Sequence, residues 1–80
     1  MRIDKFLKIS RLIKRRTAAN EACTRGLILI NEKAAKPGST IKEGDIIEIN
    51  MGKDPAKYRI ISIKEHALKE DAGSMYEMVE

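Results

Sequence analysis

The sequence predicts an α+β domain in which two N-terminal helices pack on a small, mostly antiparallel sheet. Three observations predict this class. Apolar residues recur at helical spacing near the N-terminus, they gather after Gly26 in short strand-like runs, and turn-forming residues separate these runs. Eighty residues hold one small core, and with an aromatic share of 4% that core must be built from Ile and Leu. We expect the domain over residues 1–64 and an acidic extension over 65–80.

A first amphipathic helix is predicted to begin near the N-terminus. Its buried positions follow the i, i+3, i+4 spacing: Ile3, Phe6, Leu7, Ser10 and Ile13. Asp4 in the first turn suits the positive end of the helix dipole. The basic residues at 2, 5, 8, 11 and 14 recur every three positions, which on a straight helix is a drift of about 60° per step. We therefore expect the helix to break near Ser10–Arg11, so that a turn re-aims the later cations.

A second helix is predicted to start around Arg15–Thr17, with Thr17 as its N-cap. Its buried stripe consists of small side chains, so this helix must pack closely on its neighbour: Ala19, Ala22 and Cys23. Gly26 stands where a helix C-terminal glycine belongs. Two short helices joined by a tight turn also fit a helix-turn-helix, an alternative that would imply duplex DNA as the partner.

Strands are predicted in the second half of the chain, between segments of turn-forming residues. The predicted strands are Leu27–Ile30, Ile46–Ile49 and Tyr58–Ile63, and Met75–Val79 is either a last short strand or a frayed tail. The predicted turns and loops are Asn31–Lys33, Lys36–Thr40, Glu43–Asp45, Met51–Pro55 and the polar segment 64–74.

The net charge of +4 is unevenly distributed. Residues 1–25 hold eight Lys/Arg against two acidic residues, whereas residues 65–80 hold one Lys against five acidic residues. Such a field steers a polyanion toward one end of the molecule, and nucleic acid is the natural candidate. A membrane surface is disfavoured because the basic segment lacks the face rich in Trp and Leu that an interfacial helix buries. The acidic tail is either solvated or shields the basic face.

Several classes of function are excluded by what the sequence lacks. One cysteine forms no internal disulfide, which favours a reducing, cytoplasmic location, and we expect Cys23 to be a buried, inert thiol. His66 has no neighbouring partner for metal binding or general base chemistry.

No catalytic set, secretory signal or apolar run of membrane-spanning length occurs. We therefore expect no enzyme activity, no cofactor, no metal and no membrane partner. A holdase chaperone is a weaker alternative, since an exposed apolar patch is not expected.

Four blocks of sequence together resemble a known family: Arg2–Leu7, Lys14–Ala19, Gly26–Asn31 and Gly44–Ile47. In this order and spacing they resemble the RNA-binding domain first named from ribosomal protein S-four, over about residues 1–50. The chain looks like the stand-alone members, the RqcP and ribosome-associated heat-shock protein fifteen family, and its length and Met75-Tyr76 ending are more similar to RqcP. It departs from the family at Ala22 and Cys23, where larger aliphatic residues are usual, and at Glu32-Lys33, where a glycine is usual after Asn31.

The resemblance implies a role on stalled ribosomes. Proteins of this kind bind large ribosomal subunits obstructed by a nascent chain still attached to transfer RNA, and they contact ribosomal RNA and that transfer RNA. RqcP members act with the RqcH protein during C-terminal alanine tailing. We expect this chain to do the same as a monomer.

The resemblance also implies an RNA-binding face on the two helices and their connection. The start of the second helix favours phosphate, which an arginine there can grip with two hydrogen bonds. Structured RNA recognised through backbone and shape needs few aromatic residues. The candidate RNA-binding residues are Arg2, Lys5, Lys8, Arg11, Lys14, Arg15, Arg16, Thr17, Arg25 and Lys36.

Overall fold

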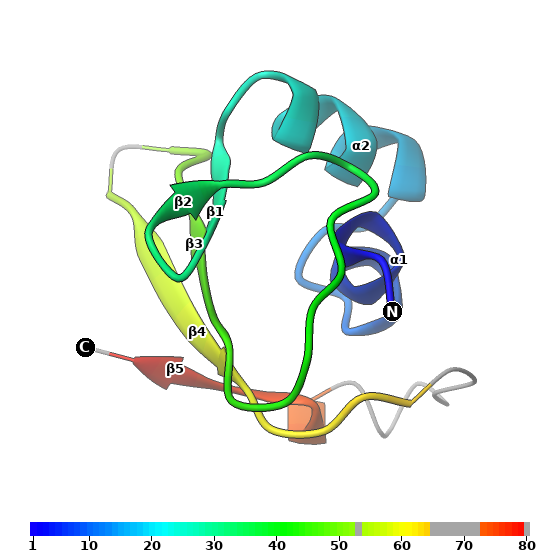
Figure 1. The fold of residues 1–80 in the computed structure, drawn as a ribbon, viewed down its shortest axis with the longest axis vertical. Coiled ribbons are helices and arrows are strands. Elements are labelled where there is room, and N and C mark those ends of the chain that lie inside the picture. The colour runs from blue at the N-terminus through cyan, green and yellow to red at the C-terminus, as the bar shows by residue number, and fades with distance from the viewer. Residues whose placement is uncertain (53, 65–72, 80) are drawn as a thin grey trace.

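The fold was obtained as a computed structural model, and it describes residues 1–52, 54–64 and 73–79. The helices are α1 (Ile3–Ile9) and α2 (Arg16–Thr24), and the strands are β1 (Ile28–Ile30), β2 (Lys33–Ala34), β3 (Ile46–Ile49), β4 (Ala56–Ile60) and β5 (Tyr76–Val79). The strands form one antiparallel sheet in the order β2-β1-β3-β4-β5. Both helices lie on the same side of this sheet (Figure 1), which confirms the predicted α+β class.

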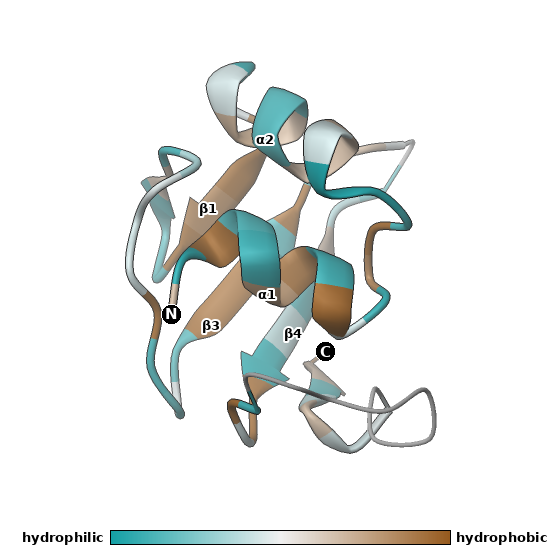
Figure 2. Ribbon diagram, turned by 90° about the vertical axis from the view of Figure 1, so that its right-hand side faces the viewer, coloured by the Kyte–Doolittle hydropathy of each residue, from teal (hydrophilic) through white to brown (hydrophobic). Residues whose placement is uncertain are grey.

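The core lies between α1 and the inner face of the sheet. Phe6 and Leu7 on α1 and Ile47 and Ile60 on the strands are fully or almost fully buried. Figure 2 shows the apolar strands directly behind α1. Each buried side chain of this size contributes about 1.5–3 kcal/mol to folding. As predicted, small residues of α2 are buried, namely Ala19, Ala22 and Cys23.

The predicted break after the first helix is confirmed. Ser10 is the C-cap of α1 and is fully buried, and its hydroxyl donates to the Leu7 carbonyl at 3.4 Å. Arg11 then adopts a positive φ of 63°, which reverses the chain direction. Ile13 is buried too, although it lies beyond the helix, and its N–H donates to the same Leu7 carbonyl at 3.0 Å. The connection between α1 and α2 is therefore anchored in the core while its charged residues face solvent.

Two of the predicted details are wrong. Thr17 is not the N-cap of α2, because Arg15 has the extended backbone of an N-cap (φ −126°, ψ 140°) and the helix begins at Arg16. Thr17 lies in the first turn instead. The third strand spans Ala56–Ile60 rather than Tyr58–Ile63, since its pairing with β3 starts at the Ile49↔Ala56 pair and Ile61 is 43% exposed beyond its end.

The sequence prediction also missed β2. Asn31 and Glu32 both have positive φ, 49° and 71°, the combination that a two-residue type I′ hairpin requires. This turn pairs Lys33 with Ile30 although no glycine follows Asn31. At the other edge, Tyr76–Val79 is a strand paired with β4 and not a frayed tail. His66 lies outside the described residues, as do the other residues of 65–72 and Glu80.

The loop that follows β2 is attached to the beginning of α1. The Ile3 N–H donates to the Ser39 carbonyl at 2.8 Å, and the Ile41 N–H donates to the Met1 carbonyl at 2.9 Å. Arg2 and Thr40 form an isolated antiparallel bridge between these segments. This attachment fixes the position of Arg2 before the first helical turn.

Candidate nucleic-acid interface

A buried carboxylate holds two arginines at the helical end of the molecule. Asp4 is 2% exposed, and its Oδ2 lies 3.2 Å from Nη2 of Arg2 while its Oδ1 lies 3.4 Å from Nη2 of Arg16. The Lys5 N–H also donates to Oδ1, at 2.8 Å. Arg2 directly precedes α1 and Arg16 begins α2, and about half of each arginine side chain remains exposed. Both can therefore donate to a ligand while Asp4 orients them.

The two arginines border a hollow of about 360 Å³. Its other lining residues are Asp4, Thr17 and Asn20. Guanidinium, hydroxyl and amide groups all donate hydrogen bonds, and the arginines also supply positive charge. This combination suits a phosphate or a ribose hydroxyl.

A second basic hollow lies at the end of α1 and on the connection that follows it. Its lining residues are Lys8, Ile9, Arg11 and Lys14, and its volume is about 340 Å³. Within the described part of the chain, neither Lys8, Arg11 nor Lys14 forms an ion pair. The charge of this hollow is therefore left for a partner to neutralise. We call it the basic hollow.

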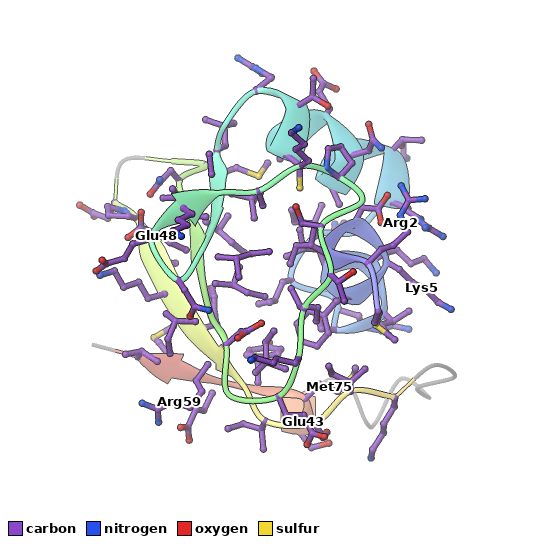
Figure 3. All side chains as sticks on the ribbon, viewed as in Figure 1. Arg2, Lys5, Glu43, Glu48, Arg59 and Met75 are labelled. Carbon is purple, nitrogen blue, oxygen red and sulfur yellow. The ribbon has the colours of Figure 1, made fainter. Side chains whose placement is uncertain are left out.

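The remaining predicted residues lie outside both hollows. Lys5 is half-buried on α1, and Figure 3 shows its side chain and that of Arg2 on the helical side, away from Glu48 and Arg59 on the sheet. Arg15 is exposed at the start of α2. Arg25 lies at the other end of α2, 4.0 Å from Glu21.

Lys36 is exposed in the loop after β2, where its N–H donates to the Ser39 hydroxyl at 2.9 Å. The structure therefore brings together six of the ten candidates in two groups: Arg2, Arg16 and Thr17, and Lys8, Arg11 and Lys14.

Two residues of the site were missed by the sequence prediction. Asp4 was assigned only to the helix dipole, and Asn20 was not considered. The signal for Asp4 was its place beside Ile3 at the start of the buried face, because a carboxylate in such a position requires a cationic or hydrogen-bonding partner. Asn20 gave no such signal, since it is one exposed polar residue among several on α2.

Cys23 lies in the core rather than in either hollow. Burial raises the pKa of its thiol, and the negative charge of Asp4 raises this pKa further. The neutral thiol is therefore favoured, which agrees with a packing role. Among residues 1–52, 54–64 and 73–79 no cluster of three potential metal ligands occurs, and no helix there is long and apolar enough to span a bilayer.

Solved structures share this fold over nearly the whole chain. The solution structure of the hypothetical protein HP1423 matches with a TM-score of 0.85 and 32% identity, covering 100% of this chain and 98% of that one. The trimeric heat shock protein 15 of Vibrio cholerae matches with a TM-score of 0.89 and 26% identity, covering 99% and 81%. Both agree with the predicted S-four-like architecture.

Sequence comparisons identify the family. The S4 domain model matches residues 1–47. The RQC P-site tRNA stabilizing factor of Halalkalibacterium halodurans is 49% identical over 78 residues, which is 98% of this chain and 89% of that protein. The protein of the same name from Bacillus subtilis is 45% identical over 76 residues, 95% of this chain and 88% of its own length. The chain therefore belongs to the S4 domain family, within its group of RQC P-site tRNA stabilizing factors.

Proposed function

We propose that this protein is an RNA-binding factor of ribosome-associated quality control. It binds large ribosomal subunits obstructed by a nascent chain, contacts ribosomal RNA and peptidyl-transfer RNA, and stabilises the transfer RNA during C-terminal alanine tailing. It acts there in the cytoplasm as a monomer, together with RqcH. The name of the relatives that are 45–49% identical, which refers to stabilising transfer RNA in the P site, supports this role.

The observation that carries the proposal is that the hollow beside Arg2 and Arg16 and the basic hollow both lie on the helices and their connection. One holds arginines already oriented by Asp4, and the other holds cations without an acidic partner among the described residues. Arginine and lysine placed in this way contact the RNA backbone, which carries no base sequence. A factor that holds transfer RNA in place requires this kind of contact and no catalytic group.

The helix-turn-helix alternative is not favoured. In a helix-turn-helix a turn of about three or four residues leads from the first helix into the second, which reads the major groove. Here residues 10–15 separate α1 from α2, and this connection turns back into the core at Ser10 and Ile13. The five-stranded sheet and the S4 domain match over residues 1–47 are also unexplained by that alternative.

Sedimentation tests the proposal. Tagged protein in cell lysate is run through a sucrose gradient, and the RNA it carries is sequenced. We expect it to migrate with free large subunits that bear transfer RNA, and we expect alanine tails on the nascent chains from those fractions. A protein that stays at the top of the gradient, or that carries DNA, would contradict the proposal.

A pair of matched variants shows whether the basic hollow is responsible. Lys8→Gln/Lys14→Gln removes two charges from it, and Lys33→Gln/Lys42→Gln removes two exposed charges elsewhere. Net charge is the same in both variants. We expect only the first to leave the large-subunit fractions, and equal behaviour of the two would mean that the face is placed wrongly.

A further inference from the structure

A third hollow, most of whose lining residues are apolar, lies between the α1–α2 connection and the turn that joins β3 to β4. Its volume is about 390 Å³, within the range of small-ligand pockets. Figure 2 shows the apolar part of the α1–α2 connection along the right-hand side of the molecule. The lining residues are Leu12, Ile13, Lys14, Ile49, Met51, Asp54, Ala56 and Tyr58. We call it the apolar hollow.

Three polar groups in the apolar hollow are available to a ligand. The Lys14 ammonium, the Asp54 carboxylate and the Tyr58 hydroxyl have no hydrogen-bond or ion-pair partner among the residues that the structure describes. The Tyr58 ring itself is held by an edge-to-face contact with Tyr76, with ring centroids 5.3 Å apart. An apolar hollow with an ordered ring and unpartnered polar groups is suited to a flat ligand that carries hydrogen-bond donors.

The apolar hollow adjoins the basic hollow, because Lys14 lines both. A phosphate held by Lys14 and its neighbours in the basic hollow would place the attached nucleotide beside the apolar hollow. The backbone itself cannot enter there favourably, since Asp54 repels phosphate. The base is thus the part of the RNA that fits.

We propose that the apolar hollow binds one unstacked guanine of the RNA held on the basic hollow, an inference that rests on the proposed function. Bases splayed out from loops and bulges are recognised by stacking on aromatic or apolar side chains and by hydrogen bonds to their edges. Guanine presents an imino N–H and an amino group side by side, which match the two oxygens of the Asp54 carboxylate. Uracil, adenine and cytosine do not offer two adjacent hydrogen-bond donors on their Watson–Crick edges.

RNA hairpins that differ in one nucleotide test this assignment. Five hairpins share one stem and carry a single bulged G, A, C or U, or no bulge, and their affinities for the full chain are measured at one salt concentration. We expect the bulged-G hairpin to bind about tenfold more tightly than the others, as for one paired base contact. Asp54→Asn should remove this preference, while the affinity for the unbulged hairpin should rise slightly because a negative charge that repels phosphate is lost.

Glu43→Gln is the matched control. Glu43 is an exposed carboxylate at the turn before β3, so its loss changes net charge in the same way as Asp54→Asn. It should keep the preference for guanine. Equal affinity of wild type for all five hairpins would overturn the guanine site, and would leave an apolar side chain of a protein partner as the occupant.

Two further results separate this inference from the proposed function. Salt-dependent binding without base preference would refute the guanine site alone. Guanine preference in a protein that stays away from large subunits would refute only the ribosomal role. If no hairpin bound at low salt, both would fail.

Discussion

The carboxylate of Asp4 lies 3.4 Å from the guanidinium of Arg16, a residue twelve positions further along the chain. This contact joins the first turn of α1 to the first turn of α2. Asp4 also contacts Arg2 at 3.2 Å, so one buried group determines where two exposed cations point. Both arginines are therefore held in place in the free protein, and RNA binding through them would cost less side-chain freedom.

Replacing this carboxylate should weaken both folding and RNA binding. Asp4→Asn keeps an acceptor for the Lys5 N–H but no charge for Arg2 and Arg16. We expect the free energy of unfolding to fall by about 1 kcal/mol, a modest value because both arginines are half exposed to solvent. Urea denaturation measures this loss, and filter binding measures RNA affinity. Reduced stability with unchanged affinity would show that Asp4 only supports the fold, and Glu43→Gln is the charge-matched control.

Arg16 should contribute more to RNA binding than an arbitrary surface cation. We expect Arg16→Ala to lose about 1–3 kcal/mol of binding free energy, the size of a charge-assisted hydrogen bond. Lys33→Ala removes an exposed cation on β2. This residue lines neither the basic hollow nor the hollow beside Arg16, so affinity should change little. Titration of both variants with the same structured RNA makes the comparison. Equal losses would mean that general charge, and not the hollow at Arg16, determines affinity.

RNA affinity should depend steeply on salt. If about six phosphates are contacted, counterion release predicts a fall of about two to three powers of ten in the association constant between 50 and 200 mM monovalent salt. Binding measured over this range gives the slope, and each cation removed from the basic hollow should lower it by about one contact. A flat salt dependence would contradict a phosphate-binding face.

The sequence predicted the elements well where periodicity and turn chemistry agreed. The break at Ser10–Arg11 followed from the drift of the basic row, and the strand Ile46–Ile49 followed from its apolar run. By contrast, β2 depends on two successive positive φ values at Asn31 and Glu32, and Glu32 is not a residue that favours them. Local propensity was overridden there by pairing with β1.

The candidate site was predicted as a set of cations, but not how they are grouped. The basic residues follow from counting charges, whereas their grouping depends on tertiary contacts with Asp4 and on the reversal at Arg11. Arg25 and Lys36 were also among the predicted cations, yet each lies outside the two hollows. Charge is visible in a sequence, and its spatial arrangement requires the fold.

The thiol of Cys23 should react slowly in the native protein. Its pKa is raised first by burial and then by Asp4, so the reactive thiolate is scarce near neutral pH. A raised thiol pKa in the folded state also means that folded protein retains a proton which the unfolded chain releases. This contribution to stability is fully present below the ordinary thiol pKa and is lost as pH rises above it. Alkylation rates with and without urea measure the protection, and equal rates would contradict it.

Replacing Arg11 by glycine should weaken RNA binding without lowering the free energy of unfolding. Its φ of 63° lies in the left-handed region, which costs a non-glycine residue about 1–2 kcal/mol. Arg11→Gly removes this cost but makes the unfolded chain more flexible by about 0.5–1 kcal/mol, so the net effect on unfolding should be near zero or slightly stabilising. Because Arg11 lines the basic hollow and has no ion-pair partner within the described residues, the same change should weaken RNA binding.

Thermal unfolding and RNA titration of Arg11→Gly together test this separation. Arg11→Lys is the control that keeps the charge and the strained backbone, and it should retain most of the affinity. A glycine variant that binds RNA as well as wild type would show that Arg11 takes no part in the interface. If the prediction holds, the strained backbone at this position is maintained by the need for a cation there, since a glycine would form the same turn at less cost.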